Sequence, residues 1–398
     1  MRKFIIKFLA LTVAIMMCIV PALSAGASRL NEGQLIQGKI ENAIVLFYEN
    51  KDIGAKNNFS EIMDKDITEY LYDKITVERL VAEKTGLYKE NYSLELNLIN
   101  KEITKDYIEF KFQVIRTCNY TISKDIDSVL SEEVIICYDL NKALITDFYT
   151  PFNSYDIAIR GENRKELSGI PYETRKERLN NLLDDINSEY EYKATGNLDS
   201  KTNAVRVVPN SRSSLNHSNI VSYARDNFNK VQPNSGNGTI PYFDFSTISG
   251  AHDCTNFVSH ALIAGGAGIY DTGASGITTT GWYYRDTENR STSWTIVSDL
   301  HTYLINNTHS GCATGFSNSY TNYNGGYWGL GDVMQFKPQG GSKYTHSAII
   351  TAKSFSADGT IAYAYVTGRT SSWQNNDNEP ADTMFSGGNK RTIYVFNY

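Results

Sequence analysis

The stretch D-C-T-N-F-V-S-H-A-L, residues Asp253–Leu262, decides the fold of the second half of this 398-residue chain. Its apolar residues recur at positions i, i+1, i+4 and i+5, which is the spacing of one face of a helix. The pair Gly265-Gly266 then supplies a helix stop signal. The pattern predicts a short amphipathic helix with Cys254 in its first turn.

A cysteine at a helix start is well placed for nucleophilic chemistry. Unpaired N–H groups and the positive end of the helix stabilise a thiolate, and the same N–H groups can hold an oxyanion. Such a cysteine also needs a base. His346 stands in a strand-like run after the Gly340-Gly341 turn, and Gly331–Phe336 reads as its hairpin partner. We expect Cys254 and His346 to form the catalytic pair, with His252 as the competing base.

Seven pieces around this pair occur in a fixed order. They are Val221-Ser222-Tyr223-Ala224, Asp253–Ser259, Ala264-Gly265-Gly266, Trp282-Tyr283-Tyr284, Ser293-Trp294-Thr295, Gly331-Asp332-Val333 with Gln335, and His346-Ser347-Ala348-Ile349. With these pieces, residues 217–398 resemble the putative amidase domain family, relatives of NlpC-type and CHAP cell-wall hydrolases in the papain-like superfamily.

The resemblance implies an α+β, papain-like cysteine hydrolase domain, in which a helix bearing the Cys packs on an antiparallel sheet bearing the His. It implies Cys254 as nucleophile and His346 as its partner, no metal and no organic cofactor. It also implies a secreted bacterial-type amidase or peptidase whose substrates are cell-wall peptides of the peptidoglycan type. Nothing in the residues themselves selects that substrate.

The sequence departs from the family at one position. The family shows a His-Thr pair on the strand after the catalytic His, where this chain has Arg369-Thr370. Arginine carries only donors and cannot accept a hydrogen bond from an imidazole N–H. The group that orients His346 is therefore open among Asp332, Thr367, Asn375, Asn376 and a backbone carbonyl.

The N-terminal half reads as a separate α+β unit. Residues around 33–84 have helical periodicity, residues around 92–150 alternate as strands, and Arg164–Tyr192 reads as a charged helix. Helices followed by antiparallel strands resemble, by element order, the cystatin-like cone of nuclear-transport-factor-type domains. We expect four parts: a signal peptide (1–27), an N-terminal α+β domain (28–160), a charged helix with a linker (161–216) and the amidase-like domain (217–398).

The N-terminal sequence and the composition indicate where the protein is located and which partners it does not bind. Basic residues, an apolar run and small residues before Ser28 predict an export signal, with a membrane anchor as the alternative. We therefore expect a secreted protein without stable membrane insertion after cleavage. The net charge of −6 and the absence of a basic stripe exclude a nucleic-acid binder. Cys118 and Cys137 lie in strand-like runs and are candidates for a disulfide.

The predicted reaction is amide or peptide hydrolysis through an acyl-enzyme. Three other classes stay open at this point: a catalytically degenerate module that binds cell-wall material or peptides, an acyl transferase, and a structural surface protein. The oligomeric state and the role of the N-terminal half do not follow from the sequence.

Overall fold

The computed structural model describes residues 25–151, 153–161, 165–194, 215–320, 328–357, 359, 361–385 and 388–398. The predicted signal peptide (apart from its last three residues) and most of the predicted linker lie outside these residues. We call residues 25–194 the N-terminal unit and residues 215–398 the C-terminal unit. None of the helices within the described ranges combines the length and the apolar character needed to cross a membrane.

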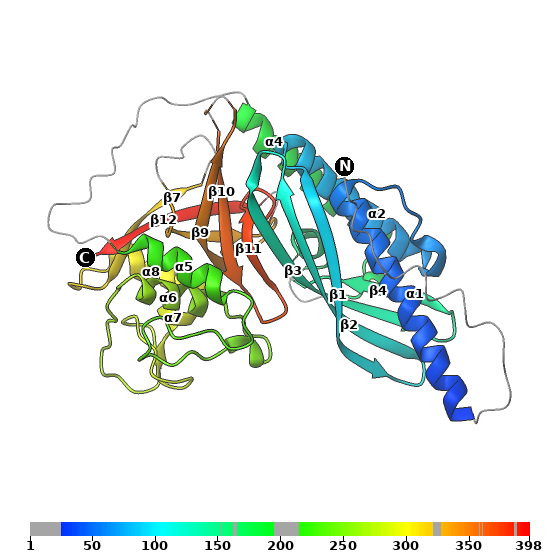
Figure 1. Cartoon of the computed structure of the whole chain (residues 1–398), viewed down its shortest axis with the longest axis horizontal. Coiled ribbons are helices and arrows are strands. Elements are labelled where there is room, and N and C mark those ends of the chain that lie inside the picture. The colour runs from blue at the N-terminus through cyan, green and yellow to red at the C-terminus, as the bar shows by residue number, and fades with distance from the viewer. Residues whose placement is uncertain are drawn as a thin grey trace, which may run out of the picture.

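The chain is an α+β protein built on one large antiparallel sheet (Figure 1). The helices are α1 (Ala25–Ile53), α2 (Lys65–Thr85), α3 (Ser154–Arg160), α4 (Tyr172–Ala194), α5 (His217–Asn227), α6 (Cys254–Ala264), α7 (Thr292–Thr295) and α8 (Val297–Asn306), with short 3-10 turns η1 (Ser60–Ile62), η2 (Leu167–Gly169) and η3 (Phe245–Thr247). The strands of the large sheet are β1 (Lys89–Ile103), β2 (Tyr107–Tyr120), β3 (Ser123–Asp139), β4 (Leu144–Tyr149), β7 (Ala313–Ser319), β8 (Val333–Lys337), β9 (His346–Phe355), β10 (Ala362–Arg369), β11 (Asn375–Pro380) and β12 (Asn389–Asn397). A separate parallel pair joins β5 (Ile277–Thr278) and β6 (Arg290–Ser291).

The N-terminal unit packs its helices on one face of β1–β4. Strand β2 alternates buried and less buried residues, and its buried set includes Phe110, Phe112 and Val114. Helices α1, α2, α3 and α4 contribute the other half of this core. Helix α2 begins at the cap Asp64 and ends at Gly86, whose φ of 70° is the left-handed conformation that glycine adopts without strain.

The C-terminal unit buries both faces of its part of the sheet. On one face, α5, α6 and α8 pack over residues such as Val333 and Ile349. On the other face, Phe336, Ala348 and Ile350 belong to a second apolar cluster. The two faces alternate along β9, as the two-residue period of a strand requires.

The two units share the sheet, whose strand order is β1-β2-β3-β11-β10-β9-β8-β12-β7, with β4 also paired to β3. Strand β11 pairs with β3 from Asn375 opposite Ser131 to Asp377 opposite Val129. Leu130, Tyr120 and Tyr365 pack together at this junction. The ladder therefore runs without a break from one unit into the other, and the strands of both units meet in the middle of Figure 1.

Several local predictions need correction. Cys118 and Cys137 form no disulfide, because Cys118 lies opposite Ser128 and Cys137 opposite Glu109 at distant points of the β2–β3 ladder. The helix expected to begin at a cap formed by Ser218 or Asn219 is capped instead by Asn216, two or three residues earlier. The charged helix α4 begins only at Tyr172, directly after Pro171, which suits the first position of a helix.

Candidate active site

Cys254 is the first residue of α6 and is 3% exposed. Its Sγ lies 3.8 Å from Thr255 Oγ1 and 4.0 Å from the carbonyl oxygen of Thr345. The backbone N–H groups of Ser347 and Thr255 lie close enough to this sulfur to favour its thiolate. The thiol therefore sits beside the first residues of β9, at the place where a neighbouring strand would otherwise pair with His346.

The surroundings of the Cys254 thiol act on its pKa in opposite directions. Burial raises the pKa, and the nearby Asp253 adds to that increase. The N–H groups of Ser347 and Thr255 and the Thr255 hydroxyl lower it, because they stabilise the thiolate. Burial dominates, so the cysteine is a neutral thiol in this conformation.

His346 begins β9 and is 5% exposed. Its ring centroid lies 5.9 Å from those of both Phe336 and Phe385, on the face of the sheet opposite α6. Burial and the neighbouring His252 lower the pKa of His346 to about 3. Within the described part of the chain, His346 Nε2 has no hydrogen-bond partner and no hydrogen bond joins this imidazole to the Cys254 thiol.

Among the candidate groups that could orient His346, Asn376 lies beside the imidazole ring. A Cβ atom on Gly368 would lie 3.1 Å from both Asn376 Oδ1 and His346 Nε2. The two polar atoms thus approach each other over the backbone of Gly368, which pairs with Asn376 in the β10–β11 ladder. The Asn376 amide nitrogen donates to the carbonyl of Val366 at 2.8 Å, which turns its oxygen toward the histidine.

The other open candidates are engaged elsewhere. Asp332 accepts from the backbone N–H of Gly329 at 2.7 Å and shapes the turn before β8. The Thr367 hydroxyl donates to Asp377 at 2.7 Å. The Asn375 amide nitrogen donates to the carbonyl of Ser372 at 3.0 Å. The Asn375 oxygen has no partner among the described residues, so Asn375 also remains a candidate. We favour Asn376 because its oxygen and His346 Nε2 both lie against Gly368.

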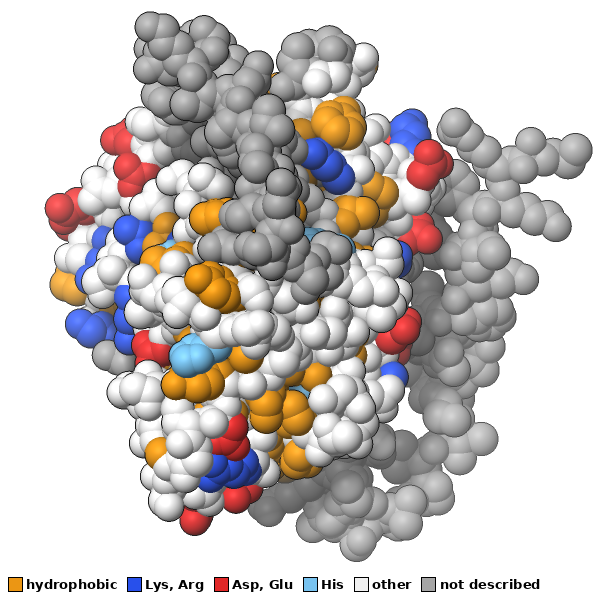
Figure 2. All heavy atoms as spheres, turned by 90° about the vertical axis from the view of Figure 1, so that its left-hand side faces the viewer, with side chains coloured by type: hydrophobic (Ala, Val, Ile, Leu, Met, Phe, Trp, Pro, Cys, Tyr) orange, Lys and Arg blue, Asp and Glu red, His pale blue; other side chains and the backbone are white. Residues whose placement is uncertain are grey.

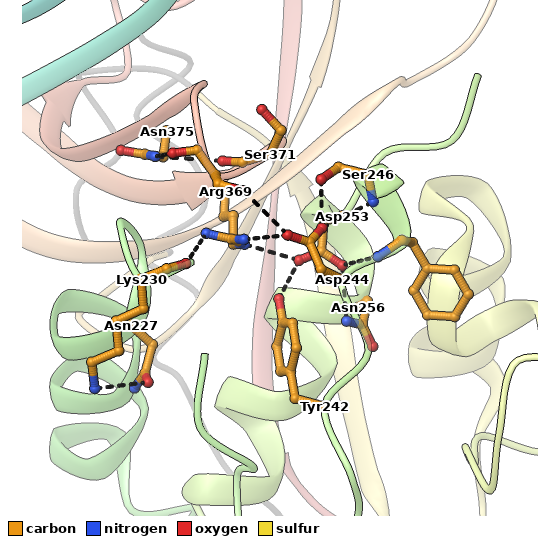
Figure 3. Close-up of polar contacts among 12 residues, drawn as sticks. Asn227, Lys230, Tyr242, Asp244, Ser246, Asp253, Asn256, Arg369, Ser371 and Asn375 are labelled. Atoms are coloured by element: carbon orange, nitrogen blue, oxygen red, sulfur yellow. Dashed lines mark hydrogen bonds and ion pairs between the residues drawn. The ribbon is translucent and has the colours of Figure 1, made fainter. Parts of the chain in front are cut away.

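Arg369, the departure from the family pattern, lies in a buried charged network (Figure 3). Its Nε donates to Asp253 at 3.0 Å, and its Nη2 donates to Asp244 at 2.5 Å. Its Nη1 donates to the carbonyl of Lys230 at 2.7 Å. The same Nη1 also donates to the carbonyl of Phe228 at 3.2 Å. The guanidinium therefore ties the loop before α6 to the end of β10, and within the described residues it makes no hydrogen bond to His346.

Asp253 is the residue directly before α6, where an aspartate commonly caps a helix. Its carboxylate makes no capping bond; it accepts from Tyr242, Asn256 and Arg369 and from the backbone N–H of Phe245. Burial and Asp244 raise the pKa of Asp253 to about 7. An aspartate directly before the cysteine was the available sequence signal. Three of its partners lie within eleven residues of it, and only Arg369 comes from a distant segment.

Two further histidines lie near the helix. His252 is exposed and precedes Cys254 by two residues, and its proximity to His346 keeps it as the competing base. His260 is fully buried among aromatic rings, with the Tyr242 ring 4.7 Å away between centroids, and its Nδ1 accepts from the N–H of Gly236. Burial lowers the pKa of His260 to about 3. His260 is therefore a packing residue.

Little in the described residues points to a metal or to a strongly charged partner. No group of three or more His, Cys, Asp and Glu side chains is arranged there to hold a metal ion. Figure 2 shows the side of the molecule that lies to the left in Figure 1, where charged side chains stand mainly toward the margins among uncharged and apolar ones. The described surface of this face has no continuous basic band.

Comparison with known proteins places the C-terminal unit in a family. Residues 214–396 match the family model described as Putative amidase domain. The match agrees with the resemblance seen in the seven ordered motifs, and it associates this part of the chain with amide hydrolysis. Neither the curated proteins nor the solved structures contain a match to this chain.

Proposed function

We propose that the protein is a secreted cysteine hydrolase that cleaves amide or peptide bonds through an acyl-enzyme. One observation carries the proposal: the Cys254 thiol lies at the start of a helix, has two backbone N–H groups close to it and abuts the first residues of the strand that begins with His346. A domain matching an amidase family supplies this site. The layout is that of a papain-like hydrolase, with a Cys helix packed on a His-bearing sheet.

The proposed reaction uses each group in turn. His346 takes the proton of Cys254, and the thiolate attacks the carbonyl carbon of the substrate. N–H groups at the start of α6 hold the oxyanion while the tetrahedral intermediate forms. His346 then gives its proton to the leaving amine, and water attacks the resulting thioester to release the acid and restore the thiol.

The imidazole must move to perform these steps. His346 has two side-chain torsions, and its Cα lies between the two backbone groups of Thr345 and Ser347 that contact the thiol. In the proposed active form the ring leaves Phe336 and Phe385 and reaches Sγ past the start of the strand. Catalytic hydrogen bonds in unliganded enzymes often tighten only when substrate binds. Asn376 is the proposed orienting group for the ring in that position.

The substrate class follows from the family resemblance and from the predicted export signal. Cell-wall peptides of the peptidoglycan type are the substrates that such a secreted hydrolase meets. The proposed reaction requires a substrate with a peptide bond whose acyl group fits beside β9. No organic cofactor enters the proposed steps.

The first prediction concerns the alkylation of Cys254 by iodoacetamide as a function of pH. In a chain with Cys118, Cys137 and Cys312 changed to alanine, we expect labelling well below pH 8, because an imidazolium stabilises the thiolate. The variant His346→Ala should lose this low-pH reactivity and follow an ordinary thiol titration.

The matched control is His252→Ala, which removes a histidine two residues from Cys254 without touching the proposed partner. Loss of low-pH labelling in this variant, with His346→Ala unaffected, would make His252 the base. Slow labelling that ignores both histidines would contradict the hydrolase proposal altogether.

A second candidate function is a peptide or cell-wall binding module without turnover. The observation that favours it is the resting state of the site, in which burial raises the pKa of Cys254 and lowers that of His346. Binding of cell-wall fragments that is equal in wild type and Cys254→Ala, with no product released by wild type, would support this function. Release of product by wild type alone would rule it out.

A further inference from the structure

A cavity of about 90 Å³ lies at the junction of the two units. A space of this size accommodates a small side group. Both units line it. The residues used below are Lys51, Glu78 and Arg116 from the N-terminal unit and His346, Asn375 and Glu379 from the C-terminal unit.

Four buried polar atoms around this cavity have no hydrogen-bond partner among the described residues. They are His346 Nε2, Asn375 Oδ1, Arg116 Nε and Tyr120 Oη. The four side chains are 5%, 5%, 2% and 1% exposed. Unpaired buried polar atoms are rare and costly, and they gather where a ligand completes their hydrogen bonds. The cavity therefore has the polar lining of a binding site, and it includes the proposed catalytic histidine.

The cationic side chains at the cavity are already paired. Lys89 lies 2.5 Å from Asp52, and Arg116 lies 3.2 Å from Asp52 and 2.5 Å from Glu132. Lys51 lies 3.8 Å from the same Asp52. One buried carboxylate behind the cavity wall thus binds all three cations.

Two carboxyl groups at the cavity lack such partners. Glu78 of α2 and Glu379 of β11 form no hydrogen bond and no close ion pair with any other described residue. When Glu379 is ionised, above its pKa of about 7, the four carboxyl groups of Glu78, Glu379, Asp52 and Glu132 exceed the three cations by one negative charge. A ligand that carries a positive charge would balance it.

The charges around Glu379 come from four elements. Arg116 of β2 and Lys89 of β1 favour its carboxylate, whereas Glu132 of β3 and Glu78 of α2 oppose it. Burial is the largest effect and raises the pKa of Glu379 to about 7. A cation bound beside this group would reverse the effect of burial, because an opposite charge favours the ionised form.

We propose that this cavity binds an ammonium group of the amide substrate between Glu379 and Glu78, so that the N-terminal unit forms part of the substrate site. The assignment of that ammonium to a substrate rests on the hydrolase function proposed above. The cavity reaches His346, and Cys254 lies against the backbone on either side of His346. An amide held at the thiol would extend past the start of β9 to place a short amine side group in the cavity, which the His346 ring lines from the other face of the sheet.

The test titrates the full chain with ethylammonium at pH 8, with ethanol and acetate as neutral and anionic probes of matched size. The readout is the imidazole NMR signal of His346, assigned with His346→Gln. We expect a saturable shift with ethylammonium alone. In Glu379→Gln the affinity should fall about tenfold, the loss expected for one charge-assisted hydrogen bond. Glu78→Gln should weaken binding in the same direction.

The control variant is Glu102→Gln, which removes an exposed carboxylate at the far end of β1 and should bind as wild type does. An equal shift with ethanol or acetate, no saturable shift, or wild-type affinity in Glu379→Gln would overturn the proposal. This binding readout needs no turnover. Ammonium binding without low-pH alkylation of Cys254 would therefore uphold the site while the hydrolase function fails.

Discussion

At the scale of single residues, Arg369 holds together the loop from which the catalytic helix starts. Its guanidinium is buried with Asp244 and Asp253, and no water shell is left to stabilise either carboxylate if the cation is removed. A residue that breaks the family pattern therefore has a structural task directly beside Cys254.

We expect Arg369→Met to lower the free energy of unfolding by about 3–5 kcal/mol, the cost of leaving a buried ion pair without its cation. Urea denaturation measures this change. The control Arg285→Met breaks the ion pair with Asp271, which is partly exposed and should matter little. Equal small losses in the two variants would show that the buried network contributes nothing special.

The titration of Glu379 gives a prediction with a definite sign. Its pKa is about 7 in the folded protein, against 4.5 for an unperturbed glutamate. The folded state thus binds more protons than the unfolded state between these values, and stability must fall as the pH rises through this window. Glu379→Gln should remove up to about 3 kcal/mol of that fall.

Denaturation at pH 5 and pH 8 measures the effect of Glu379. The slope should not vanish in the variant, because the pKa of Asp253 is also raised to about 7 and acts in the same direction. Glu102→Gln should behave as wild type. A variant whose stability changes with pH as steeply as that of wild type would contradict the assignment to Glu379.

The residue types of the site could be found in the sequence, but their contacts could not. Cys254 at a helix start and His346 at a strand start were visible from local periodicity. The partners of Asp253 and Arg369 depend on tertiary packing between segments far apart in the chain. The same holds for the face of the sheet to which the His346 ring points.

At the scale of elements, the approach of three strands at Gly368 controls where the His346 ring lies. A Cβ at this position would lie 3.1 Å from His346 Nε2 and 3.2 Å from Ala348 Cβ. These contacts are tight, so the ring or the strand must shift. Glycine here is required by close approach and not by an unusual backbone angle.

We expect Gly368→Ala to displace the imidazole and to change the pH profile of Cys254 alkylation while the protein stays folded. Circular dichroism checks the fold, and the iodoacetamide assay reads the site. Gly169→Ala is the matched control, because an added Cβ there meets nothing within 4 Å. An unchanged profile in Gly368→Ala would mean that the ring does not depend on this spacing.

Secondary structure was predictable wherever one face of an element is buried. The strand periodicity of residues 92–150 and the Cys helix with its Gly265 stop are both present in the structure. The predicted hairpin around Gly340-Gly341 is also present as β8 and β9. The predicted disulfide between Cys118 and Cys137 was wrong because residue type and strand assignment do not determine the register in which two strands pair.

At the scale of the whole molecule, the ladder between β3 and β11 makes the two units depend on each other. Element order suggested two separate α+β parts, and no local pattern signals a pairing between Val129–Ser131 and Asn375–Asp377. Long-range strand pairing leaves no short-range trace in a single sequence. The cavity at this junction was invisible for the same reason.

We expect a truncated chain of residues 215–398 to self-associate, because removal of β3 leaves the backbone of β11 as an open sheet edge. Size-exclusion chromatography over a range of concentrations measures this. The full chain is the control. Its β11 is already paired with β3, so its elution volume should not change with concentration. A soluble truncated monomer would show that β11 does not need its partner.

The order of synthesis gives the β3–β11 ladder a further meaning. The ribosome completes Val129–Ser131 long before Asn375–Asp377, so the nascent N-terminal unit carries an unsatisfied stretch of strand while the rest is made. Glu132 and Glu133 follow that stretch directly and discourage pairing with other nascent chains. Closure of this distant pairing is a late folding event. The pocket beside His346 therefore comes into being only after the chain has been made almost to its last strand.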